Sequence, residues 1–197
     1  MKKTRFGFTL IELLIVIALL GALAVGLLAA LDPFEQLKKG TDTGVRNTVS
    51  ELHGAIIRYY GIKNYMPWCN DATCSAPLNG ISAPGDIATA ITALTLHGGA
   101  GHTPTSADTE YQISSAGELK SNFGQLAGDG TLEKIKLIGS QTNATVVVCY
   151  QPTAKSFIND PNTKFLPSTL QENTVTSGAG ACKKDSGGAV DCLWCVQ

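Results

Sequence analysis

Six cysteines carry most of the covalent chemistry open to this chain, and all follow its apolar N-terminal segment: Cys69, Cys74, Cys149, Cys182, Cys192 and Cys195. An even number of cysteines behind a membrane-insertion signal indicates a disulfide framework in an oxidising compartment. Among the possible pairings, we predict Cys69 with Cys74, Cys149 with Cys195, and Cys182 with Cys192 across a turn at 186–188. Zinc is the alternative, because the spacings of Cys69/Cys74 and Cys192/Cys195 could hold a metal, although no nearby histidine supports it.

The histidines and the glycine-rich stretch give no recognisable catalytic pattern. His53, His97 and His102 are scattered, and no Ser/His/Asp or Cys/His arrangement surrounds them, so we interpret them as surface or loop residues. The stretch 98–101 lacks the strand, the helix and the lysine of a phosphate-binding loop. The sequence therefore predicts no enzyme, no cofactor and no metal site.

Size and charge set limits on the class of protein. The chain has 197 residues, 44% of them hydrophobic, which is enough for one substantial core beside the apolar N-terminus. The formal net charge is -1, and lysine and arginine cluster only at the extreme N-terminus. Because nucleic-acid binding leaves a basic footprint, we do not predict nucleic acid as a main partner.

The N-terminus has the composition of a membrane segment behind a short basic leader. Lys2, Lys3 and Arg5 precede a run from Phe8 to Leu31 that is apolar apart from Thr9 and Glu12. As a helix that run would span roughly 36 Å, enough to cross a hydrocarbon core of about 30 Å, with the basic flank in the cytoplasm. An ordinary secretory signal cut between Ala22 and Ala30 is the alternative. A processing point at Gly7 would instead leave the helix on the mature chain.

The segment from Gly7 to Val16, GFTLIELLIV, resembles the processing and assembly motif of type IV prepilins and related pseudopilins. The resemblance implies that prepilin peptidase cuts after Gly7 and methylates the new amino group of Phe8, and that Glu12 guides assembly. It further implies a leader at 1–7, a membrane and filament-core helix at 8–31, and an extracytoplasmic head at 32–197. Such a subunit would sit in lipid across the cytoplasmic membrane, then join a surface pilus through the assembly machinery.

Glu12 also has a physical argument of its own. A carboxylate at the centre of a membrane helix costs on the order of 2.5 to 3.5 kcal/mol, so a partner is expected. The mature α-amino group of Phe8 would be largely cationic at neutral pH and would attract Glu12 of a neighbouring subunit in a low-dielectric filament core. The alternative is that Glu12 reaches the headgroups or pairs with the amino group of its own helix.

The rest of the chain predicts an α+β head, a long helix packed on a small antiparallel sheet with a disulfide-tethered C-terminal region. Apolar residues at spacings of three and four continue the helix to about Tyr60, although Gly21, Gly26, Gly40 and Gly44 weaken it and its bend is not fixed. Residues 64–84 form a loop stapled by Cys69 and Cys74. The sheet is expected from three segments at 132–138, 144–151 and 155–158.

Three local patterns complete this prediction. Asp86 caps a short helix carrying Ile87, Ile91 and Leu94 that ends near His97. Ser115 and Glu118 form a capping box for another helix ending at Gly128. The sequence Asn-Ala-Thr at 143–145 fits a glycosylation acceptor, although this pattern is common by chance and lies beside a predicted strand. Some pseudopilins bind calcium in a C-terminal loop, but Asp185 and Asp191 lack the dense oxygen ligands of such a site.

Three functions fit these features. The first is a structural pilin whose homo-oligomeric filament serves adhesion, motility or DNA uptake. The second is a minor pilin or a pseudopilin of type II secretion, placed at a tip or acting as a piston. The third, from another class, is a membrane-tethered binding module that never polymerises. The filament functions require Glu12, whereas the tethered module does not.

Overall fold

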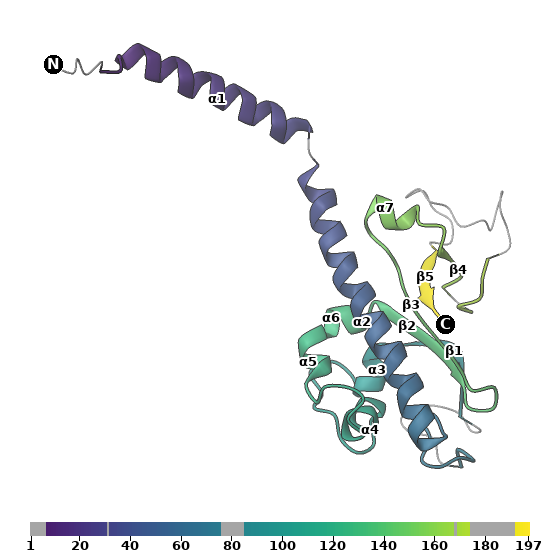
Figure 1. The fold of residues 1–197 in the computed structure, drawn as a ribbon. Coiled ribbons are helices and arrows are strands. Elements are labelled where there is room, and N and C mark those ends of the chain that lie inside the picture. The colour runs from purple at the N-terminus through teal and green to yellow at the C-terminus, as the bar shows by residue number, and fades with distance from the viewer. Residues whose placement is uncertain (1–6, 31, 76–84, 168, 174–191) are drawn as a thin grey trace.

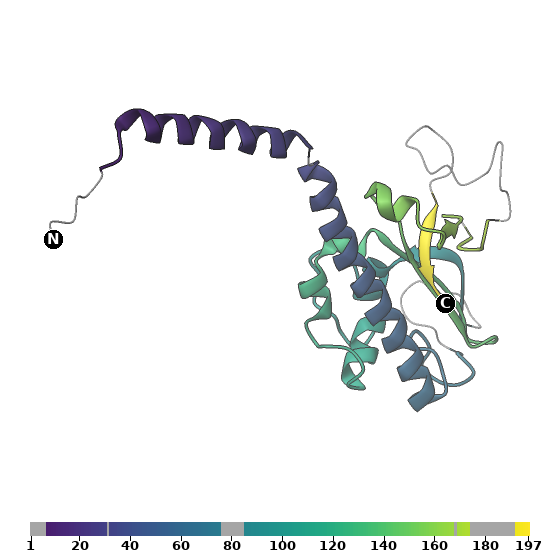
Figure 2. The ribbon, with the colours of Figure 1, turned by 45° about the horizontal axis from the view of Figure 1, so that its top comes forward.

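The structure is a computed structural model that describes residues 7–30, 32–75, 85–167, 169–173 and 192–197. The N-terminal helix α1, Leu10–Ala30, stands clear of the folded head, as Figures 1 and 2 show from two directions. Helix α2, Pro33–Lys63, follows it and runs along the head. Neither Gly21 nor Gly26 interrupts α1, and neither Gly40 nor Gly44 interrupts α2.

The chain bends between the two helices, just before Pro33. Asp32 has an extended backbone and is the N-cap of α2, where its side chain accepts the N–H of Glu35 at 3.3 Å. Proline follows at the first helical position, where its fixed φ and missing N–H suit a helix start. The bend is therefore the start signal of a new helix and not a kink within one helix.

One face of α2 forms the centre of the head. Its buried apolar residues recur every three or four positions and pack mainly on strand β3, as predicted: Val45, Val49, Leu52, Ala55, Ile56 and Tyr59. The helix ends three residues beyond the predicted Tyr60, where Asn64 adopts a left-handed conformation and closes the last turn.

The sheet has five antiparallel strands in the order β1-β2-β3-β5-β4. Strands β2, Ile135–Ser140, and β3, Thr145–Tyr150, pair as an antiparallel hairpin and correspond to the first two predicted strand segments. Strand β5, Leu193–Val196, lies between β3 and the short β4, Thr163–Phe165. The long helix and the antiparallel sheet confirm the predicted pilin-like α+β fold.

The helix predicted to start at Asp86 is wrong over most of its length. Residues Asp86–Thr92 form strand β1, which pairs with β2, and only Ala93–His97 is helical, as α3. A spacing of four between Ile87 and Ile91 suits a strand as well as a helix, because both residues then lie on one face of either element. Hydrogen-bonded pairing with β2 stabilises this segment as a strand. The predicted end near His97 is correct, since Gly98 is its left-handed cap.

The capping box predicted at Ser115 is also wrong. Ser115 is the last residue of helix α4, Thr109–Ser115, and the next helices are only α5, Phe123–Ala127, and α6, Asp129–Leu132. Glu118 instead accepts Nε of Arg58 on α2 at 2.7 Å, so a partner distant in sequence replaces the local cap. The predicted helix end at Gly128 is confirmed. In Figure 1 these short helices flank α2 on the side away from β4 and β5.

The third predicted strand is a helix, α7, Lys155–Ile158. The cause lies on α2, whose carboxylates cap the start of α7 from outside. Asp42 Oδ2 accepts the N–H of Thr153 at 2.8 Å and that of Ala154 at 2.7 Å, and Glu35 accepts the N–H of Lys155 at 3.0 Å. The β-like composition of the segment is overridden because these distant acceptors satisfy N–H groups at the start of a helix.

Two predicted disulfides are present, Cys69–Cys74 and Cys149–Cys195. The first lies against Gly85, whose φ of +88° and missing side chain allow the contact, because a Cβ there would collide with Cys74 Sγ. The second joins the facing strands β3 and β5. The predicted pair Cys182–Cys192 includes a residue outside the described part of the chain and stays a prediction. Asp185 and Asp191 also lie outside it.

Arg46 on α2 links the long helix to the C-terminal part of the head. Its guanidinium carbon lies 4.4 Å from the ring centroids of both Phe157 and Trp194, and Nη2 donates to Asp160 Oδ2 at 2.6 Å. We name this group of four residues the Arg46 clamp. The Arg46 side chain is 21% exposed, so these interactions are partly shielded from water. The clamp therefore joins α2 to α7, to β5 and to the segment between α7 and β4.

We expect Arg46→Ala to lower the free energy of unfolding of the full chain in detergent micelles by about 2 to 3 kcal/mol, the sum of two partly desolvated cation–π contacts and one ion pair. Urea titration followed by tryptophan fluorescence measures it. Arg58→Ala is the matched control, because Arg58 lies on the same helix with 54% of its side chain exposed, and a loss below about 1 kcal/mol is expected there. Equal losses would contradict the clamp.

The same variant should change the acid dependence of stability. The hydrogen bond from Arg46 lowers the pKa of Asp160 below its usual value. A depressed carboxyl pKa stabilises the fold above the unfolded-state value of about 3.9, and this stabilisation is lost as pH falls through the folded-state pKa. The difference between wild type and Arg46→Ala should therefore shrink below about pH 4. A difference that stays constant down to pH 2 would contradict this.

The two described disulfides should differ in their contribution to stability. Cys149 and Cys195 are separated by 46 positions, and Cys69 and Cys74 by 5. Loop-closure entropy then predicts a loss of about 4 kcal/mol for Cys149→Ala with Cys195→Ala, against about 2 kcal/mol for the other double variant. Urea unfolding of the two double variants tests the ranking, and a larger loss at Cys69–Cys74 would reverse it.

Candidate processing and assembly site

The predicted cleavage point lies in exposed, non-helical chain immediately before α1. Gly7 and Phe8 are exposed, with 88% of Phe8 accessible, and among the described residues no atom beyond the chain neighbours of Gly7 lies within 4 Å of where its Cβ would be. Helix α1 begins only at Leu10. The bond between Gly7 and Phe8 is therefore exposed and lies outside any helix, as access by a peptidase requires. The leader cations Lys2, Lys3 and Arg5 lie outside the described residues.

Glu12 and Thr9 cap the first turn of α1 reciprocally. Glu12 Oε2 accepts both the backbone N–H and the hydroxyl of Thr9 at 2.8 Å, and Thr9 Oγ1 accepts the N–H of Glu12 at 3.3 Å. This is a capping box, which satisfies two N–H groups that a helix start would leave without partners. This capping role of Thr9 was not predicted from the sequence. Its signal was present as the pattern Thr-x-x-Glu, which also marks a helix start.

Helix α1 presents an apolar surface on all sides. Its stretch Leu10–Leu28 has a mean hydropathy of 2.8 and no part of it is buried in the head. At about 1.5 Å per residue, its 21 residues match a hydrocarbon core of about 30 Å. Within α1, Glu12 is the only ionisable residue. The capping box therefore gives this carboxylate two donors of its own chain at one end of the apolar helix.

The cysteines do not form a metal site within the described residues. Cys69 and Cys74 bond to each other, as do Cys149 and Cys195, and Cys192 is disulfide-bonded too. No group of three potential metal-ligating side chains occurs in the part of the chain that the structure describes. The disulfides instead tether the loop after α2 and the last strand of the sheet.

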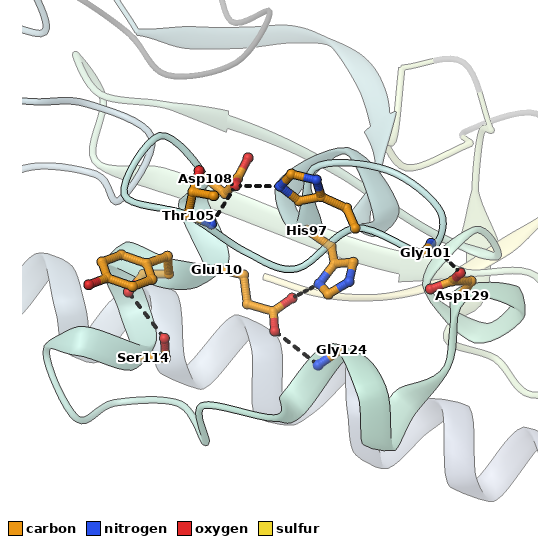
Figure 3. A network of polar contacts seen from close by, with 10 residues as sticks. His97, Gly101, Thr105, Asp108, Glu110, Ser114, Gly124 and Asp129 are labelled. Atoms are coloured by element: carbon orange, nitrogen blue, oxygen red, sulfur yellow. Dashed lines mark hydrogen bonds and ion pairs between the residues drawn. The ribbon is translucent and has the colours of Figure 1, made fainter.

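The interpretation of all three histidines as surface or loop residues is wrong for His97. His97 on α3 is buried, and its Nδ1 lies 2.7 Å from Glu110 Oε2 on α4. His102 has 37% of its side chain exposed and bonds through Nε2 to Asp108 at 2.9 Å. Figure 3 shows two separate groups of polar contacts among the short helices: Glu110 lies between His97 and Gly124, and Asp108 lies beside Thr105. Glu110 lies thirteen residues after His97, so no local sequence pattern predicted that the two residues would pair.

His53 occupies a third environment. It lies half-buried on α2, where burial lowers the pKa of its imidazole. None of the described residues gives a histidine both a nucleophile and an orienting carboxylate in hydrogen-bond contact. The two histidine–carboxylate pairs are therefore structural links in the short-helix region.

We expect Thr9→Ala to weaken the first turn of α1 by about 1 kcal/mol, because it removes the hydroxyl from the capping box. Amide hydrogen exchange of residues 10–13, measured on the full chain in micelles, should then accelerate about fivefold. Thr9→Ser keeps the hydroxyl and is the matched control. Unchanged exchange in Thr9→Ala would show that the cap does not hold this turn.

Comparison with known proteins bears on this N-terminal region alone. The model of the prokaryotic N-terminal methylation motif matches residues 2–28. No curated protein and no solved structure matches the chain significantly. The matched range covers residues 2–7 of the predicted leader, the predicted cleavage point, the capping box and most of α1. The chain thus carries the type IV prepilin signature at its N-terminus, ahead of a pilin-like α+β head.

Proposed function

We propose that this protein is the structural subunit of a surface filament, inserted in the membrane as a prepilin, cleaved after Gly7, N-methylated at Phe8 and polymerised. The observation that carries the proposal is α1 itself, whose apolar surface is entirely uncovered within the subunit. A helix that is apolar on all sides must be covered by lipid or by other apolar helices. Lipid covers it before assembly, and the α1 helices of neighbouring subunits cover it in the filament.

Glu12 supplies the pairing between subunits in this proposal. Before cleavage its carboxylate is held by Thr9, with Oε2 accepting two hydrogen bonds. Cleavage creates a cationic amino group at Phe8, four positions before Glu12. In the low-dielectric filament core an unpaired carboxylate is costly, so pairing with the amino group of a neighbour fixes the axial register. Thr9 can keep its own contacts while Oε1 accepts this new donor.

The head and its partners follow from this arrangement. Helix α2 carries the disulfide-bonded head away from the membrane segment, so that the head forms the outer surface of the filament (Figure 1). Prepilin peptidase and the pilus assembly machinery are the partners that the signature implies. The proposal includes no catalytic role. Adhesion, motility and DNA uptake are tasks of a complete filament.

Mass spectrometry of sheared cell-surface material tests the proposal. We expect an N-terminal peptide that begins at methylated Phe8, in material dominated by this chain. A processed chain present only in traces would make it a minor pilin or a pseudopilin. A chain that keeps Met1, or one cut near Ala30, would overturn the prepilin processing itself.

Substitution of Glu12 separates assembly from processing. We expect Glu12→Gln to reduce the subunit in sheared filaments by at least about tenfold, because a charged pair in the filament core is lost, while cleaved protein remains in the membrane. Glu51→Gln is the matched control, since Glu51 lies exposed on α2 and should leave the yield unchanged. Normal filament yield with Glu12→Gln would show that Glu12 does not supply the pairing between subunits, whereas absence of the wild-type chain from sheared filaments would support a membrane-tethered module instead.

A further inference from the structure

A cavity of about 300 Å³ opens among the short helices of the head. Its walls come from the end of α3, from α4, from the loop between them, and from α5 with the loop before it. Most of its lining side chains carry a hydroxyl or an amide, and the described residues that line it include no lysine or arginine. A cavity of this size is at the small end of ligand-binding pockets.

The inner wall of the cavity holds a buried polar pair. His97 and Glu110 have only 3% and 5% of their surface exposed, and both line the cavity. Glu110 Oε2 lies 2.7 Å from His97 Nδ1, and Oε1 accepts the N–H of Gly124 at 2.9 Å (Figure 3). A Cβ at Gly124 would collide with the His97 ring, so this glycine lets α5 approach the pair. The wall is thus fixed from three helices before any ligand arrives.

The rim of the cavity carries polar groups that the fold does not use. The side chains of Ser121, Asn122 and Gln125 are exposed and form no hydrogen bond with the described residues. Asn122 occupies the N-cap position of α5, yet it makes no capping bond. Tyr111 adds an aromatic ring that is 42% exposed. Amides and hydroxyls both donate and accept hydrogen bonds, and an aromatic ring packs against apolar C–H groups.

The chemistry of this lining selects the class of ligand. An anionic ligand would meet the Glu110 carboxylate without any lysine or arginine among the described lining residues to offset it, and for a cationic ligand both oxygens of Glu110 are already engaged, by His97 and by the N–H of Gly124. A neutral molecule rich in hydroxyl groups can donate to the remaining lone pairs of Glu110, exchange hydrogen bonds with Asn122 and Gln125, and lay its C–H face on Tyr111. We propose that this cavity binds a neutral monosaccharide unit of a glycan.

This proposal goes beyond the filament function and is independent of it, because the cavity belongs to a single head. A head that binds sugar without polymerising would overturn the filament and keep this site. A filament whose heads bind no sugar would overturn this site and leave the filament function standing. The two proposals can therefore fail separately.

Saturation-transfer NMR on the full chain tests the site, in micelles of a detergent without a sugar headgroup so that the detergent does not compete. The probes are methyl β-D-glucopyranoside, methyl β-D-galactopyranoside and N-acetylglucosamine, with glucuronate as the charged comparison. We expect transfer to at least one neutral probe and none to glucuronate. Asn122→Ala and Gln125→Ala should each weaken binding about fivefold, the usual effect of one neutral hydrogen bond.

Asn143→Ala is the matched control, because Asn143 is another exposed amide, in the β2–β3 turn far from the cavity in sequence. Circular dichroism confirms that each variant is folded. Three results would overturn the proposal. They are the absence of transfer to every neutral probe, stronger binding of glucuronate than of the neutral sugars, and binding that is unchanged in both cavity variants.

Discussion

The uncovered apolar surface of α1 is the constraint on which the rest of the structure depends. No part of Leu10–Leu28 packs on the head, so the head must build its core without this helix. It does so around α2, whose buried face packs on β3. The chain passes from one environment to the other at Asp32 and Pro33, where one helix stops and a separately capped helix begins. Lipid or neighbouring helices can therefore surround α1 without any change in the head.

The contacts that complete the head connect α2 to segments more than a hundred residues away. Asp42 caps the start of α7, and Arg46 lies between the rings of Phe157 and Trp194. Both residues lie on the half of α2 nearest the membrane segment. They hold the C-terminal region on the helix, and the disulfide Cys149–Cys195 holds it on the sheet. The polar contacts thus add to the small buried cluster of Cys149, Phe165, Leu170 and Leu193 that packs this region.

The sequence predicted those features whose causes are local. The buried face of α2 repeats every three or four residues, the β2–β3 hairpin is rich in β-branched residues, and Cys69 lies five positions from Cys74. The N-terminal signature was also local. The predictions were wrong where a residue distant in sequence determines the local structure. Asp42 caps the start of α7, and pairing with β2 makes Asp86–Thr92 a strand. His97 is buried against Glu110 on another helix. At Thr9 the local pattern Thr-x-x-Glu was present, but the adjacent run was interpreted only as a membrane segment, so the capping box was not predicted.

The place of β5 in the sheet sets an order on folding. Leu193–Val196 is inserted between β3 and β4, although both of those strands precede it in the chain. Helix α2 and the β2–β3 hairpin can therefore form before the last strand is present, whereas β4 has only its bridge to Glu172 until Leu193 and Trp194 are available. The disulfide of Cys149 likewise cannot form before Cys195 is present. In the proposed prepilin, completion of the head would thus follow the passage of the last residues across the membrane, and it would need an oxidant outside the cytoplasm.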